Sequence, residues 1–317
     1  MLEHFVIPTI PSRDSLSEES LRLARSIHAA RTLTEYASDW GGFVTWCTQN
    51  ARDSLPAANE TVARYVTDLL TRGRKIKTAK RHIAALVYHH RIAGFDSPVT
   101  ADVRAIITGA QRLRGEQPQQ KAAITVGQLR EMATRIPRPE PYLSRDRAVL
   151  IFGFATALRR SSIVSLDLDD IKFTGGGMIV SIRREKQDQA GVGRMIGIPW
   201  GAAEETCPVR VLKRWLAWRG SEAGPLFFGL NHGINGGRMH TNTVARIVKR
   251  AVDSIGLDQS RYGAHSLRAG FVTEALAAGA GEILTARHTG HRSLTTLRLY
   301  LRPDDPFRAN ACAAIGL

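Results

Sequence analysis

The sequence predicts a mainly α-helical protein with a small β-sheet, divided into two domains. Over most of the chain, apolar residues recur at intervals of three and four, the period of helices that bury one face. Residues 178–182 and 194–198 are rich in Ile, Val and Met over short runs, which is typical of strands. The chain of 317 residues, 43% of them hydrophobic, is long enough to fill two cores.

The chain is strongly basic, with 44 Lys and Arg against 29 Asp and Glu and a net charge of +15. This charge predicts a polyanionic partner, and double-stranded DNA fits best. Residues 1–121 hold 17 basic and 12 acidic residues, and the rest hold 27 and 17, so we expect both domains to contact DNA. A membrane surface is the alternative, but the sequence has neither a membrane-spanning apolar run nor a signal peptide.

The cysteines and histidines do not form a pattern that predicts a metal site. Cys47, Cys207 and Cys312 lie far apart, and His232 and His240 have no ligand spacing relative to them. This distribution is typical of reduced, buried thiols in a cytoplasmic protein. We expect neither a metal ion nor another cofactor.

The first third of the chain predicts a helical domain over residues 17–113. A Pro-rich arm, residues 1–16, precedes it. Helical periodicity then covers residues 17–50, a segment after Pro56, and residues 78–93 and 103–113. Residues 114–122 are polar, contain Gly and Pro, and predict the linker to a second domain.

A basic run lies between two of these helices. Six of the ten residues in 72–81 are Lys or Arg. A solvated surface is the ordinary explanation, but this run begins a helix whose N-terminal amides also attract phosphate. We therefore expect DNA-phosphate contacts from five of these six basic residues, namely Arg74, Lys75, Lys77, Lys80 and Arg81.

Residues 123–303 predict the second domain, which combines helices with the two strands. Thr125 is a candidate N-cap for the first helix, and Thr241 or Asn242 for a later one. A buried helix that begins near residue 144 leads to Arg159. The two strands predict a hairpin, with Lys186 at the entry to its loop. Residues 304–317 predict a short C-terminal helix.

Residues 265–300 concentrate groups that suit chemistry at a phosphodiester. Arg268 can hold two phosphate oxygens, and His265 and His291 can donate or accept protons near neutral pH. Tyr300 can attack phosphorus and form a covalent bond. Each residue alone has a structural explanation, but the motif His-x-x-Arg, followed by Gly-His and a Tyr nine residues later, is far more specific.

Two upstream residues, Arg159 and Lys186, extend this set. In their order along the chain, the six residues resemble the active-site set of the tyrosine recombinases, or phage integrase family. The compact size and the spacing around Lys186 are most similar to the simple, Cre-like members. The resemblance implies a helical, SAM-like core-binding domain and an α+β catalytic domain. Ser162 is a departure, because the family usually has Glu or Asp three residues after the first arginine. The matching residues are Arg159, Lys186, His265, Arg268, His291 and Tyr300.

The resemblance also implies a mechanism, in which Tyr300 forms a 3′-phosphotyrosyl bond without a metal or ATP. Arg159 and Arg268 would offset the charge that develops on the phosphate. His265 would take the tyrosine proton, and His291 would bind a phosphate oxygen. Lys186 would protonate the departing 5′-oxygen, and His265 or Lys172 is the next candidate for that role. Should Tyr300 not be the nucleophile, Tyr262 and Tyr142 are the alternatives.

By the same resemblance, we expect a homotetramer on DNA with inverted-repeat half-sites, and a monomer or weak dimer off DNA. Residues 304–317 would dock on a neighbouring protomer or pack against their own. The expected location is the cytoplasm, in association with the nucleoid. Two other functions stay open: a type IB topoisomerase, which reseals the strand that it cuts, and a non-catalytic DNA-binding accessory protein.

Overall fold

A computed structural model of the chain describes residue 28 and residues 30–115, 120–183, 185, 193–230 and 237–300. The chain folds into two compact units, Met1–Pro118 and Gln119–Leu317. The expected N-terminal arm and C-terminal helix lie outside the described residues, and so does Lys186. None of the helices in the described part of the chain is long and apolar enough to cross a membrane.

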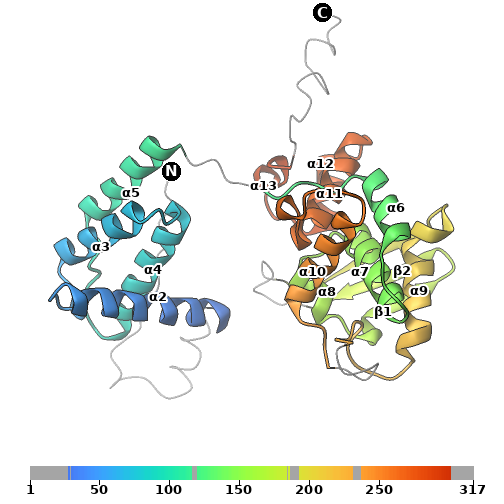
Figure 1. Cartoon of the computed structure of the whole chain (residues 1–317), viewed down its shortest axis with the longest axis horizontal. Coiled ribbons are helices and arrows are strands. Elements are labelled where there is room, and N and C mark those ends of the chain that lie inside the picture. The colour runs from blue at the N-terminus through green and yellow to red at the C-terminus, as the bar shows by residue number, and fades with distance from the viewer. Residues whose placement is uncertain are drawn as a thin grey trace, which may run out of the picture. The chain divides into compact units, whose positions relative to one another are not determined.

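The first unit contains four described helices (Figure 1), namely α2 (Ala30–Gln49), α3 (Asn59–Thr71), α4 (Ile76–Ile92) and α5 (Ala101–Arg114). Their apolar faces meet in one core, in which Phe43, Val62, Val66 and Leu86 are completely buried. α5 ends at Gly115, which has a left-handed backbone conformation (φ +52°) that glycine adopts without strain. The periodicity thus predicted the helical character of this unit.

The second unit is built around one helix that is buried on all sides. α7 (Tyr142–Thr156) contacts α6 (Val126–Arg135), α8 (Arg160–Ser165) and α9 (Pro208–Arg219), as well as α10 (Thr241–Asp253) and α11 (Ala264–Ala277). Residues 148–152 of α7 are almost completely buried, which explains why this segment is apolar without a polar face. α12 (Glu282–Thr289) and α13 (Leu294–Arg298) follow α11 and complete the described part of the unit (Figure 1).

The sheet of this unit has three antiparallel strands in the order β1–β2–β3. β2 (Gly177–Ile182) and β3 (Arg194–Pro199) are the expected hairpin, in which Met178 pairs with Ile198. β1 (Ile171–Thr174) was not expected, because its four residues are too few to show alternation. At the β1–β2 turn, a side chain at Gly177 would place its Cβ 2.1 Å from the Ile198 carbonyl oxygen, so only glycine fits.

The helix caps agree with the sequence in one case and differ in another. The Thr125 side chain accepts a hydrogen bond from the Gln128 amide, and the Gln128 side chain accepts one from the Thr125 amide. This capping box confirms the expected start of α6. The prediction for α10 was wrong, because the cap is His240, whose ring accepts a hydrogen bond from the Asn242 amide.

Candidate active site

Five of the six proposed active-site residues lie together in the second unit. Arg159 immediately precedes α8, and His265 and Arg268 lie on the first turns of α11. His291 follows the end of α12, and Tyr300 follows α13. The contacts described below join the last four directly, and the charge of Arg159 acts on both Arg268 and His291.

Tyr300 lies between the two histidines. Its hydroxyl is 2.7 Å from Nε2 of His265, which is hydrogen-bond distance. The tyrosine ring centre is 5.7 Å from that of His265 and 5.6 Å from that of His291. Tyr300 is buried, whereas His265 is exposed. His265 is therefore placed to accept the phenolic proton and to exchange it with solvent.

Arg268 is held rigidly by backbone carbonyl groups. Its side chain is almost completely buried, and Nη1 donates to the carbonyl oxygens of Ala157, at 2.8 Å, and Thr289, at 2.7 Å. Burial and the nearby positive charge of Arg159 lower the pKa of Arg268 to about 10. Arg268 is thus still protonated at neutral pH, and the N–H groups that neither these carbonyl groups nor His291 take can bind an anion.

Ala157 supplies one of these carbonyl groups from an unusual backbone conformation. It ends α7 with φ +50°, in the left-handed region that residues with a Cβ rarely adopt, and its side chain is completely buried. This conformation stops the helix two residues before Arg159. The strained position therefore fixes both the carbonyl group that holds Arg268 and the start of the Arg159 segment.

The hydrogen bonds of His291 identify its protonation state. Thr289 Oγ1 donates to the Thr285 carbonyl oxygen at 2.7 Å, so it accepts from Nδ1 of His291 at 2.6 Å. Nε2 then carries the lone pair and accepts from Arg268 Nη2 at 3.1 Å. Burial, and after it the charges of Arg268 and Arg159, lower the pKa of His291 to about 4. His291 is therefore neutral at physiological pH in the DNA-free protein.

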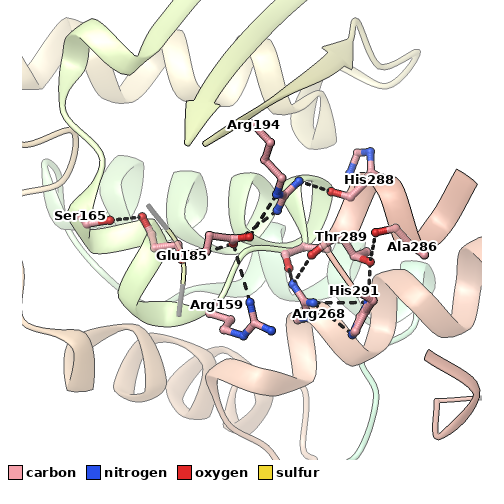
Figure 2. Close-up of polar contacts among 11 residues, drawn as sticks. Arg159, Ser165, Glu185, Arg194, Arg268, Ala286, His288, Thr289 and His291 are labelled. Atoms are coloured by element: carbon pink, nitrogen blue, oxygen red, sulfur yellow. Dashed lines mark hydrogen bonds and ion pairs between the residues drawn. The ribbon is translucent and has the colours of Figure 1, made fainter. Parts of the chain in front are cut away.

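A buried carboxylate, Glu185, lies beside Arg159 (Figure 2). Its Oε2 accepts from Arg194 Nε at 3.1 Å, and its Oε1 lies 3.9 Å from Arg159 Nη1. Arg194, at the start of β3, also donates to the His288 carbonyl oxygen at 2.6 Å. The sequence reasoning did not select Glu185 or Arg194, because nothing in the local pattern distinguishes them from surface charges.

The Glu185–Arg194 pair explains the glycine of the Gly-His motif. Gly290 has φ +69°, and a Cβ there would lie 2.8 Å from Arg194 Nε and 2.9 Å from Glu185 Oε2. His288, two residues before Gly290, is fixed by a hydrogen bond from Nε2 to the Ala155 carbonyl oxygen and by stacking on Phe271. The turn that carries His291 is thus tied to both α7 and β3.

The proposed DNA-binding residues of the first unit differ in how they are engaged. Arg74, Lys75, Lys77 and Lys80 are exposed around the start of α4. Arg81 instead forms two hydrogen bonds to the buried carboxylate of Asp39, at 2.8 and 2.9 Å, and joins α4 to α2. Within the described segments, no cluster of three or more His, Cys, Asp or Glu residues is arranged to hold a metal ion.

The fold has counterparts among solved structures of DNA-bound recombinases. A lambda integrase dimer bound to a COC′ core site superposes with a TM-score of 0.63, over 90% of this chain and 93% of the other, at 16% identity. XerH recombinase bound to its difH substrate gives 0.57, over 78% and 67% of the two chains, at 19% identity. These likenesses define the class of fold, which is mainly α-helical with a small antiparallel sheet.

Sequence comparison then identifies the family. Residues 123–306 match the phage integrase family. An integrase/recombinase xerD homolog of Selenomonas ruminantium is 32% identical over 308 residues, which are 95% of this chain and 90% of the relative. Recombinase cre of Escherichia phage P1 is 28% identical over 64% of this chain and 59% of the relative. This chain belongs to the phage integrase family of tyrosine recombinases, as the active-site motifs predicted.

Proposed function

We propose that this protein is a site-specific DNA recombinase that cleaves and rejoins strands through a 3′-phosphotyrosyl intermediate. The observation that carries the proposal is the 2.7 Å contact between the Tyr300 hydroxyl and His265 Nε2, beside Arg268 and Arg159. Membership of the phage integrase family supports it, since the relatives are named as recombinases.

In the cleavage step, the Tyr300 oxygen attacks the scissile phosphorus and its proton passes to His265 Nε2. A free tyrosine has a pKa near 10, so this transfer is needed at neutral pH. The bond from phosphorus to the 5′-oxygen breaks, and that oxygen takes up a proton, for which we propose Lys186 as donor. Arg268 and Arg159 offset the charge on the two non-bridging oxygens. The phosphodiester is exchanged for a phosphotyrosine, so no ATP is consumed.

His291 has two successive roles in this proposal. In the DNA-free protein it accepts a hydrogen bond from Arg268 and holds that guanidinium in place. A phosphate that enters the site brings negative charge, which raises the pKa of His291 and favours a proton on Nε2. His291 then donates to a phosphate oxygen while Arg268 binds its neighbour.

DNA binding by the first unit would depend on the basic run at the start of α4. We propose phosphate contacts from Arg74, Lys75, Lys77 and Lys80. Arg81 would have a double role: two of its N–H groups are bound to Asp39, and Nη1 lies 3.6 Å from Glu35 Oε2 in an exposed ion pair for which a DNA phosphate can compete. Each phosphate contact that is lost should lower the salt dependence of binding by about one unit of slope.

Strand exchange also requires assembly, for which we propose a homotetramer on paired inverted-repeat half-sites in the cytoplasm, in association with the nucleoid. Attack by the 5′-hydroxyl of a partner strand on the phosphotyrosine then joins new strands. A type IB topoisomerase would instead reseal the original strand. The two outcomes are distinguished by whether product strands contain segments from two different duplexes.

The test is covalent capture of the protein on DNA. A duplex selected from a random-sequence pool by binding to the full chain is prepared with nicks at successive positions, so that cleavage beside a nick releases a short fragment and traps the enzyme. The wild type should form an adduct that survives a denaturing gel. Tyr300→Phe removes only the attacking oxygen and should bind DNA without forming the adduct.

Two other tyrosines provide matched controls. Tyr262→Phe and Tyr142→Phe remove the same atom elsewhere in the second unit, and both should retain adduct formation. The Tyr142 hydroxyl donates a hydrogen bond to the Leu230 carbonyl oxygen, so it has a structural role that does not require catalysis. An adduct from Tyr300→Phe would contradict the assignment, and no adduct from the wild type at any nick would favour a non-catalytic DNA-binding protein.

A further inference from the structure

Glu185 is a carboxylate buried among arginines at the edge of the active site. Only 6% of its side chain is exposed. Arg194 and Arg159 approach it from different sides (Figure 2), and Arg194 makes contacts of 3.1 and 3.4 Å to its two oxygens. A buried carboxylate is costly unless it is paired with a cation. One of the two partners of Glu185 is Arg159, which we propose to bind the scissile phosphate.

The charges around Glu185 show what this carboxylate offsets. Arg159, Arg194 and Arg268 lie close enough that the first two lower the pKa of Arg268, whereas Glu185 raises it. In the absence of DNA, three guanidinium groups repel one another across a partly buried space. Without a negative charge among them, Arg159 has an electrostatic reason to turn away from Arg268.

The structure assigns Glu185 the role of a positioning residue, which holds the Arg159 guanidinium next to Arg268 so that both are in place when a phosphate arrives. This assignment rests on the proposed recombinase function. Glu185 lies just beyond β2 and is remote in sequence from α8, yet it serves the arginine that precedes α8.

The side chain of residue 162 faces the same space. Ser162, on the first turn of α8 and buried, has its Oγ 3.5 Å from Glu185 Oε1. A carboxylate on a slightly longer side chain at position 162 would therefore reach the volume that the Glu185 carboxylate now fills. Serine leaves room for Glu185, and the two positions are alternative sources of one negative charge.

The test measures cleavage by Glu185→Gln, which keeps the shape of the side chain and removes its charge. Adducts are timed at saturating DNA on two nicked substrates, one with an ordinary scissile phosphate and one with a neutral methylphosphonate there. On the ordinary phosphate we expect a loss of roughly 10–100-fold, the range typical of residues that orient active-site groups. A methylphosphonate has a neutral methyl group in place of one charged non-bridging oxygen, so its cleavage depends less on a second arginine. The deficits of Glu185→Gln and Arg159→Ala should therefore shrink together on it.

Asp146→Asn is the matched control, because Asp146 is also a buried carboxylate between two arginines, Arg145 and Arg250. It has no contact with the active-site residues, so its cleavage rate per folded molecule should equal that of the wild type. Full activity of Glu185→Gln would overturn the assignment. So would a deficit of equal size on both substrates, which indicates a general structural role. A wild type that forms no adduct would instead refute the recombinase function itself.

If Glu185→Gln folds poorly, a second variant that moves the negative charge from position 185 to position 162 still tests the assignment. The double variant Ser162→Asp/Glu185→Ala empties the volume of the Glu185 carboxylate and restores a negative charge to it from α8. Cleavage within about threefold of the wild-type rate is the result expected. A folded double variant, judged by circular dichroism, that is as slow as Arg159→Ala on the ordinary phosphate would overturn the assignment.

Discussion

Gly290→Ala should destabilise the second unit far more than an ordinary glycine substitution, and two separable costs contribute. The first is the left-handed backbone at φ +69°, which costs a residue with a Cβ about 1–2 kcal/mol. The second is crowding, because the new Cβ would lie below 3.0 Å from both Arg194 Nε and Glu185 Oε2. Separating that pair sacrifices a charged hydrogen bond, which contributes about 1.5–3 kcal/mol.

The sum, roughly 2.5–5 kcal/mol, is a large part of the 5–15 kcal/mol that stabilises a typical domain. Gly279→Ala provides the matched control in the same unit. Gly279 also has a left-handed backbone, at φ +87°, but no atom lies within 4 Å of a Cβ built there. It should therefore show only the backbone cost, about 1–2 kcal/mol.

Native-state hydrogen exchange, read by mass spectrometry on peptides from α7 and α11, measures the free energy of unfolding of this unit separately from the first. Equal losses for Gly290→Ala and Gly279→Ala would refute the reasoning, because crowding would then contribute nothing. Arg194→Ala provides a further check. It removes the nearest atom, so the crowding cost of Gly290→Ala should largely disappear in the double variant.

Three other outcomes are expected. Lys186→Ala should slow cleavage by roughly 10²–10⁴-fold if Lys186 is the proton donor, and replacing the bridging 5′-oxygen with sulfur should restore most of it, because thiols ionise near pKa 8.5. Arg268→Ala should not be rescued by sulfur. Removal of residues 304–317 should spare binding to one half-site but weaken cooperative binding to the second in a gel-shift titration; unchanged cooperativity would mean that this segment packs in cis. The folded pKa of His291, about 4, lies below its ordinary value near 6.5, so the unfolded chain binds this proton first. The stability that His291 contributes is thus complete above pH 6.5 and is lost as the pH falls towards 4. Urea unfolding across this range should show a shallower decline for His291→Gln, and identical slopes would contradict the neutral state.

The sequence could predict what depends on residues close together in the chain. Helical periodicity predicted which helix faces are buried in both units. Thr125 predicted the start of α6, because the capping box that it forms with Gln128 spans only four residues. The motifs were also informative, since His265, Arg268 and Tyr300, which they predict to form a phosphate site, lie together in the structure. The structure adds that the Tyr300 hydroxyl contacts His265 directly.

The features that the sequence could not predict depend on contacts between distant segments. β1 is visible only from its pairing with β2, and His240 caps α10 although histidine is an uncommon cap. Arg194 becomes a recognisable part of the site only when β3 lies against the end of α12, where the His288 carbonyl group accepts its hydrogen bond.

Ser162 shows the limit most clearly. The absence of a carboxylate at this position is visible in the sequence, but a charge can reach a given volume from any element that packs nearby. The second unit contains 17 glutamate and aspartate residues that a sequence pattern does not tell apart, whereas the structure shows that the buried side chain of Glu185 lies 3.9 Å from Arg159. An active site of this kind constrains the position of a negative charge in space and leaves its position in the chain open. Substitutions at 162 and 185 should therefore be coupled to each other and independent of distant carboxylates such as Asp146.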